Sequence, residues 1–474
     1  MRIWNTDTTG SNSSTYYEYF QIKNGGTPTQ PVIVCGVPDV LGNLPILDGN
    51  NAVGQSGISS GGVAGYGIMS VWAGPPTPYG YWQGGSAGPS YVSVTGLHLR
   101  HGGPLYSYIP PGGGASVPWV AGASCVNLRS GSYVDVGGND MDTCTNGFFT
   151  AENANSAWAN ITQLVTVTGN HIHASGLAGS ASYHQVYFQT YYGLMQGNLV
   201  NNYLSTAQGS NIKWRGVEGI FRYNYLGTGP ARDFDLVENQ DAYQYITFEG
   251  YLGSPGATSC NGMWCLGDTA GANIIAAYQE SEQKDFVYGN EIFPAGQNQI
   301  HYAADNTGGM SDRNGTLYFY NNTMPGTEVV FDTGENGDGM NPICQQRVDA
   351  RNNIFWANKL TGTGSAVALD HYQTLTLNAT TNLFESGSMS ITTPIVGGSF
   401  SGGSAIGWQA GCDATCLWPL SSPINTHIYG LTSANFLLTP TTPFNTTTLV
   451  PVAGSAAIGA GTELTGIPAT LPVR

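Results

Sequence analysis

Apolar and polar residues alternate in short runs along most of the chain, and Gly, Asn, Ser or Pro separates one run from the next. Within 183–189, for example, Val186 and Phe188 alternate with Gln185, Tyr187 and Gln189. A period of two residues is typical of a β-strand with one face in a core. No stretch sustains the 3.6-residue period of an amphipathic helix. The pattern therefore predicts an all-β protein built from short strands.

A short motif recurs along these runs: an apolar stretch, an asparagine, one variable residue, and then an aliphatic or aromatic residue. Segments 167–172 and 319–324 are clear copies, and 94–99 and 247–252 are weaker ones. A period of about 20–50 residues indicates a solenoid, and a unit this short without a helix fits one turn of a parallel β-helix. The motif positions, counted from the first clear copy, are 170, 198, 224, 250, 290, 322, 352 and 382.

Asparagine has a physical reason to recur at a corner of such a coil. It tolerates left-handed backbone, and its amide can stack and hydrogen-bond with the same residue in the next turn. A sandwich of two sheets with coincidental turn residues is the alternative, and the number of clear copies disfavours it.

Three stretches carry a resemblance: 212–225 (IKWRGVEGIFRYNY), 315–324 (GTLYFYNNTM) and 349–355 (DARNNIF). Together with the ending VAGSAAI at 452–458, they make the chain similar to the secreted bacterial right-handed parallel β-helix repeat proteins of the pectate-lyase-like superfamily. The resemblance implies a right-handed parallel β-helix with long irregular loops. Because this superfamily includes lyases, hydrolases, phage tailspikes and adhesins, the fold alone does not select an activity.

We expect one parallel β-helix domain over 31–460. It would be preceded by a partial turn or extension at 1–30 and followed by a tail at 461–474. Three segments rich in Gly, Pro, Ser or Tyr predict loops that project from the coil: 53–90, 102–124 and 385–435.

Composition narrows the classes of function. Charged residues make up 9% of the chain, and the formal net charge is −16. This disfavours a nucleic-acid partner, because attraction to phosphate needs a basic surface. No run of 18 apolar residues is present, so we expect no membrane-spanning helix.

The eight cysteines include two close pairs, Cys260/Cys265 and Cys412/Cys416, each of which could close a small loop by a disulfide. Free buried thiols or a metal site are the alternatives. Disulfides would indicate an oxidising compartment. We therefore expect a secreted or cell-surface protein, although no apolar leader follows the first residues.

Candidate chemistry lies on the outward positions of several strands. Alternation places Tyr187, Lys213 and Asp235 outward on successive turns, which are about 4.8 Å apart in a sheet. His301 would lie about two turns further on. Basic and acidic residues gather around these positions in an otherwise charge-poor chain. The alternatives are a ligand groove and a solvated ladder of ion pairs.

A groove with these residues would suit β-elimination on a uronic-acid polysaccharide. Lys213 could act as the base, Tyr187 could protonate the leaving oxygen, and Arg215 could neutralise the substrate carboxylate. Lyases of the similar superfamily use Lys or Arg as the base, in many cases with calcium. The further candidates are Gln189, His184, Arg232 and His301 for substrate binding, and Asp233, Asp235 and Glu238 for a calcium ion.

Other functions stay open at this point. Asp233, Asp235 and Glu238 could supply paired carboxylates for glycoside hydrolysis. Poorly capped solenoid ends and a composition rich in small polar residues also suit a non-catalytic fibre or adhesin that self-associates end to end. A carbohydrate-binding module is a third class. For such a module, aromatic residues of the first loop could form a sugar-stacking platform; these are Trp72, Tyr79 and Trp82.

Overall fold

The computed structural model forms two compact units. Unit 1 is 1–216 with 239–255 and 470–474, and unit 2 is 217–238 with 256–469. The structure describes residues 1–6, 14–54, 65–73, 88–151, 162–216, 218–229, 231–237, 284–293, 299–302, 316–327, 329–332, 347–359, 367–370, 376–378, 383–385, 395–397, 406–407, 427–429, 453 and 464.

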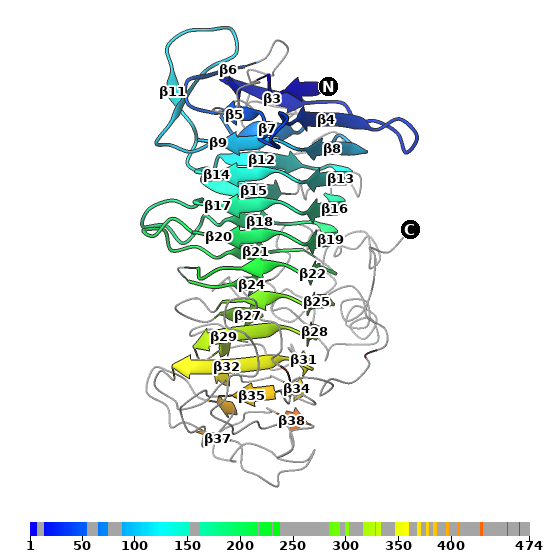
Figure 1. Cartoon of the computed structure of the whole chain (residues 1–474), viewed down its shortest axis with the longest axis vertical. Helices are drawn as coiled ribbons and strands as arrows, with labels where there is room; N and C mark the ends of the chain where they lie inside the picture. The colour runs from blue at the N-terminus through cyan, green and yellow to red at the C-terminus, as the bar shows by residue number, and fades with distance from the viewer. Residues whose placement is uncertain are drawn as a thin grey trace, which may run out of the picture. The chain divides into compact units, whose positions relative to one another are not determined.

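Unit 1 is a coil in which successive turns contribute strands to three sheets, and strands of neighbouring turns pair in parallel (Figure 1). Sheet 1 contains β1 (Arg2–Trp4), β4 (Val32–Val37), β8 (Val92–Thr95), β13 (Ser132–Gly137), β16 (Gln163–Thr168) and β19 (Tyr191–Gln196). Sheet 2 contains β3 (Glu18–Ile22), β7 (Gly67–Val71), β12 (Ser124–Arg129), β15 (Asn146–Ala151), β18 (Val186–Phe188) and β21 (Ile212–Trp214). Sheet 3 contains β2 (Thr15–Tyr16), β5 (Ile46–Asp48), β9 (His98–Arg100), β14 (Asp140–Asp142), β17 (His171–His173) and β20 (Leu199–Asn201).

Unit 2 is built from the same kind of turn. One sheet contains β22 (Ile220–Arg222), β25 (Asp285–Tyr288), β28 (Thr316–Tyr320), β31 (Arg347–Arg351), β34 (Thr376–Asn378) and β38 (His427–Tyr429). The second contains β24 (Phe234–Leu236), β27 (Ile300–Tyr302), β30 (Val329–Asp332), β33 (Val367–Asp370), β36 (Ile395–Gly397) and β37 (Ile406–Gly407). The third contains β23 (Tyr225–Leu226), β26 (Glu291–Ile292), β29 (Thr323–Thr327), β32 (Ile354–Lys359) and β35 (Leu383–Glu385). The described residues contain no helix. The prediction of an all-β parallel β-helix is therefore confirmed.

The core of each turn comes from the alternating apolar positions. In unit 1, Phe148, Phe188 and Trp214 lie fully buried on successive strands of sheet 2. Their rings meet edge to face, with centroids 5.6 Å apart for the first pair and 5.0 Å apart for the second. Such pairs add about 0.5–1.5 kcal/mol beyond the apolar area that they bury. The period-two pattern of the sequence thus becomes a column of aromatic rings inside the coil.

A ladder of buried asparagines forms the corner between sheets 1 and 3. The backbone amide of Asn139 donates to Oδ1 of Asn170 at 2.9 Å, and the amide of Asn170 donates to Oδ1 of Asn198 at 2.9 Å. In each case Nδ2 donates to the same oxygen, at 3.1 Å and 3.0 Å. The residue before Asn170 is Gly169, with φ of 64°, a left-handed conformation that glycine adopts without strain. Unit 2 has its own ladder of Asn224, Asn290, Asn322 and Asn353.

The ladder corrects the sequence analysis at two positions. Asn139 is a member that we did not count among the motif positions. Asn353, rather than Asn352, accepts the bonds from Asn322. The weak copy at 247–252 lies outside the described residues, and Asn224 donates to Asn290, 66 residues further on. Position 382 lies outside the described residues.

All three predicted loop segments contain paired strands. β7 lies within 53–90, and 102–124 contains β10 (Ser107–Ile109) and β11 (Val117–Pro118). β10 pairs in parallel with β6 (Ala52–Gly54) and antiparallel with β11. Within 385–435 the structure places β36, β37 and β38. The prediction of a single domain over 31–460 stays a prediction.

A disulfide joins Cys125 and Cys144 inside unit 1, where both residues are fully buried. It is not one of the two close pairs proposed from spacing, and those four cysteines lie outside the described residues. Among the described residues, no helix has the length and apolar character needed to cross a membrane.

Candidate functional site

The outer face of sheet 2 in unit 1 brings two predicted catalytic residues together. β18 and β21 pair in parallel with Tyr187 opposite Lys213. The inward neighbours Val186, Phe188 and Trp214 are fully buried, as alternation predicted. The ring of Tyr187 stacks on Phe149 of β15, with centroids 4.9 Å apart. The predicted acid and base therefore occupy directly opposed positions on adjacent turns.

The charged residues of this face are buried. Lys213 is 3% exposed and Arg215 is 9% exposed. Burial of charge is costly unless the charge is paired or hydrogen-bonded. Lys213 and Arg215 are therefore not members of a solvated ladder of ion pairs.

His184 and Gln189 flank the same strand. Nδ1 of His184 accepts a hydrogen bond from the Ser210 amide at 2.9 Å, which leaves Nε2 to carry the proton in the neutral ring. The His184 ring lies 5.7 Å from the Tyr187 ring. Nε2 of Gln189 is buried and has no hydrogen-bond partner among the described residues. A buried donor without a hydrogen-bond partner lowers the stability of the fold.

Unit 2 holds the remaining predicted residues. Asp235 and His301 are opposed on the paired strands β24 and β27, so His301 lies one turn after Asp235 and not about two turns further on, as predicted. Nδ1 of His301 lies 2.7 Å from Oδ1 of Asp235. Nη1 of Arg232 donates to the same oxygen at 2.9 Å. A calcium ion bound through this oxygen would compete with the guanidinium, so the arrangement does not favour calcium. Asp233 is fully buried, and Glu238 lies outside the described residues.

Trp72 does not provide an open sugar-stacking surface. It is 4% exposed, and the guanidinium carbon of Arg129 lies 5.0 Å from the centroid of its ring. The same guanidinium lies 5.1 Å from the centroid of the Phe149 ring. These contacts pack the segment down. The other two predicted platform residues, Tyr79 and Trp82, lie outside the described residues.

A second group of polar side chains lies on the outer face of sheet 3 in unit 1. The register of β9, β14 and β17 aligns His98, Asp140 and His171 in one column. A parallel column contains Asp48, Arg100, Asp142, His173 and Asn201. We call the set Asp140, His171 and His173 the histidine–aspartate cluster.

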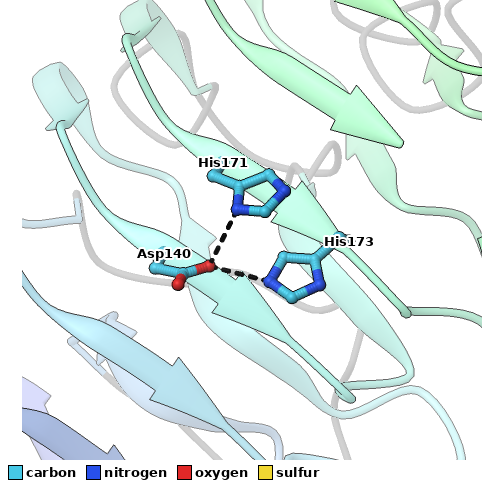
Figure 2. Close-up of side chains that lie close together, drawn as sticks. All are labelled: Asp140, His171 and His173. Carbon is cyan, nitrogen blue, oxygen red and sulfur yellow. Dashed lines mark hydrogen bonds and ion pairs between the residues drawn. The ribbon is translucent and has the colours of Figure 1, made fainter. Parts of the chain in front are cut away.

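Both histidines of this cluster direct a ring nitrogen toward the same carboxylate oxygen (Figure 2). Nε2 of His173 lies 2.9 Å from Oδ1 of Asp140, and Nδ1 of His171 lies 3.4 Å from it. The two rings stack with centroids 4.0 Å apart. The three side chains are between 23% and 36% exposed, so solvent reaches the cluster.

Neighbouring side chains orient the group. Nε2 of His171 lies 3.0 Å from Oδ1 of Asn201. On the preceding turn, His98 is hydrogen-bonded through Nε2 to Asp142, and the hydroxyl of Thr143 donates to Asp142 at 2.6 Å.

The electrostatics favour ionised carboxylates. Burial would raise the pKa of Asp140, but the hydrogen bond with His173 and the charges of nearby histidines outweigh it, and the pKa lies below its ordinary value. Burial also opposes the ionisation of Asp142, whose pKa is lowered by His98 and Thr143. The hydrogen bond to Asp140 raises the pKa of His173 above its ordinary value. The two aspartates and His173 therefore stabilise one another's charged forms.

Sequence reasoning missed this cluster, although the chain contains a pattern that could have revealed it. Asp140 and His171 each follow a ladder asparagine by one residue, and Asp142, His173 and Asn201 follow one by three. Residues that follow the ladder asparagines by the same number of positions lie opposite one another on adjacent strands. His171 and His173 flank the buried Ile172, so alternation places both on the outer face but does not connect them with Asp140.

A scan against models of protein families finds no family that matches this chain, and searches of the curated proteins and of the solved structures find no similar protein.

Proposed function

We propose that the protein acts on a uronic-acid-containing polysaccharide and cleaves it by β-elimination at the outer face of sheet 2 in unit 1. The observation that carries the proposal is the register of β18 and β21, which opposes Tyr187 and Lys213. Adjacent parallel strands are about 4.8 Å apart, so the two side chains are close enough to act on one sugar residue.

The reaction assigns one step to each group. The side-chain amine of Lys213 takes the proton from C5 of the uronate, and the electron pair of that bond forms the C4–C5 double bond. The C4–O bond breaks, and Tyr187 donates a proton to the departing oxygen. Arg215 pairs with the substrate carboxylate, which makes the C5 proton more acidic.

Two further contacts support a polar ligand at this face. The unpartnered Nε2 of Gln189 is a donor that a sugar hydroxyl or carboxylate could satisfy. The stack of Phe149 on Tyr187 restricts the phenol to one orientation, as positioned catalytic groups require. The disulfide between Cys125 and Cys144 supports an extracytoplasmic location.

The test is a screen of pectin, alginate and glycosaminoglycans for new ultraviolet absorbance from unsaturated uronate ends. We expect one polymer to yield product. Lys213→Ala should lower the rate by about a hundredfold or more, because general base catalysis contributes about 10²–10⁴. Tyr187→Phe should also lower it, while keeping the ring that stacks on Phe149. Lys23→Ala, at a partly exposed lysine after β3, is the matched control and should leave the rate unchanged.

The absence of product from every polymer would overturn the lyase proposal. So would product formed at an unchanged rate by Lys213→Ala. Binding of a polymer without cleavage would replace it with the carbohydrate-binding alternative.

A further inference from the structure

We propose that the histidine–aspartate cluster on sheet 3 is a binding site for a divalent transition-metal ion, held by Asp140, His171 and His173. This site is separate from the face of sheet 2, and the proposal does not depend on polysaccharide cleavage. Its ligand atoms come from two adjacent strands, β14 and β17, whose register is fixed by parallel pairing.

The spacing of the three ligand atoms fits a metal ion. Metal–ligand bonds of about 2.0–2.2 Å place the ligand atoms of a tetrahedral site roughly 3.3–3.6 Å apart. Nδ1 of His171 lies 3.4 Å from Oδ1 of Asp140, and Nε2 of His173 lies 2.9 Å from it. All three ligand atoms lie within 4.8 Å of one another. A small rotation of the His173 ring would bring the nitrogen to the separation that coordination needs.

The hydrogen bond from His171 to Asn201 orients the His171 ring as a metal ligand. Oδ1 of Asn201 accepts hydrogen bonds only, so Nε2 of a neutral His171 carries the proton. Its Nδ1 then presents a lone pair to the carboxylate oxygen of Asp140. Two acceptors that face each other repel unless a proton or a metal cation lies between them. Ligating histidines usually donate their other N–H to a carbonyl or carboxylate oxygen, which is the role of Asn201 here.

Carboxylates outnumber guanidinium groups among the described side chains of this face. Among its described side chains are the carboxylates of Asp48, Asp140 and Asp142, and one guanidinium, that of Arg100. Arg100 donates to Asp48 at 2.8 Å, and Asp142 is held by His98 and Thr143. Asp140 is therefore the carboxylate that remains for the two stacked histidines.

The ligand types select the class of metal. Two imidazoles and one carboxylate suit zinc, cobalt, nickel or copper, whereas calcium and magnesium prefer oxygen ligands alone. The partial exposure of all three side chains leaves room for water to complete the coordination. Three protein ligands with an open position are typical of sites that exchange an outer ligand.

The experiment is a calorimetric titration of the untagged, chelator-treated full chain with Zn²⁺, and a titration with Co²⁺ followed by visible absorbance. We expect one Zn²⁺ per chain, a Co²⁺ spectrum typical of nitrogen ligands, and no competition from an equal concentration of Ca²⁺. His171→Ala/His173→Ala should abolish the Co²⁺ spectrum. Asn201→Ala removes no ligand and should weaken binding by about tenfold or more.

His101→Asn is the matched control on the same face. His101 lies outside the cluster, hydrogen-bonds Asp48 at 2.7 Å, and has φ of 68°, which asparagine tolerates. It should leave Zn²⁺ affinity unchanged. The proposal is overturned if the wild-type chain binds no Zn²⁺, or if the double variant, folded by circular dichroism, binds it as tightly as the control.

Discussion

Asn170 offers the sharpest test of the coil, because its side chain makes four hydrogen bonds in a buried corner. Its Nδ2 donates to the Val136 carbonyl at 2.9 Å and to Oδ1 of Asn198 at 3.0 Å. Its Oδ1 accepts from the amide and from Nδ2 of Asn139, at 2.9 Å and 3.1 Å. A net value of about 1 kcal/mol per bond predicts that Asn170→Ala lowers the free energy of unfolding by about 4 kcal/mol.

Asn170→Asp tests the direction of the bonds. An aspartate of nearly the same shape keeps the two accepted bonds but cannot donate to Val136 or Asn198. Its charge would be buried, because Asn170 is 2% exposed. We expect Asn170→Asp to be at least as destabilising as Asn170→Ala at neutral pH, because a buried unpaired charge costs more than a lost amide.

Urea denaturation followed by circular dichroism measures both effects. Asn24→Ala is the control, because Asn24 is exposed in a bend, and surface substitutions usually change stability by less than about 0.5 kcal/mol. The reasoning is refuted if Asn170→Ala shifts the unfolding midpoint no further than Asn24→Ala, or if Asn170→Asp is as stable as the wild type.

Three other predictions concern stability. Replacing Cys125 and Cys144 by serine should lower the free energy of unfolding by about 3 kcal/mol, the chain-entropy value for a loop of this size; equal urea midpoints would contradict it. Burial raises the pKa of Glu291, so its charge is penalised in the folded chain at neutral pH. Glu291→Gln should raise the melting temperature at pH 7, and the gain should vanish as pH falls below the ordinary glutamate pKa. Burial opposes ionisation of Asp48, but hydrogen bonds from His101 and others lower its pKa overall. The ionised Asp48 carboxylate therefore adds to the free energy of unfolding above the ordinary aspartate pKa, and this stabilisation is lost as pH falls through the lowered pKa. Asp48→Asn should therefore cost about 2 kcal/mol at pH 7 and little at pH 2 in urea titrations; a cost independent of pH would count against this.

The strands could be predicted from the sequence because the inner face of a coil needs apolar side chains at every second position. Phe188 and Trp214 lie where alternation placed them. The asparagine motif identified the corner, but Asn352 was chosen over Asn353 because both residues fit a short motif. Only the hydrogen bonds to Asn322 distinguish them.

The site could be predicted only in part, since contacts between turns depend on the length of each turn. Tyr187 and Lys213 were paired correctly because each has a clear apolar neighbour that fixes the register. Asp140 and His173 are 33 residues apart, and nothing local connects them. Burial of Lys213 was not foreseeable either, because alternation gives a direction for a side chain but does not describe what lies above it.

The bond from Asn224 to Asn290 joins residues 66 positions apart, whereas the bond from Asn290 to Asn322 spans only 32. The hydrogen bond between successive ladder asparagines is thus the same whether 66 or 32 positions separate them. New sequence can enter at such a junction, and be lost again, without altering the stacking on either side.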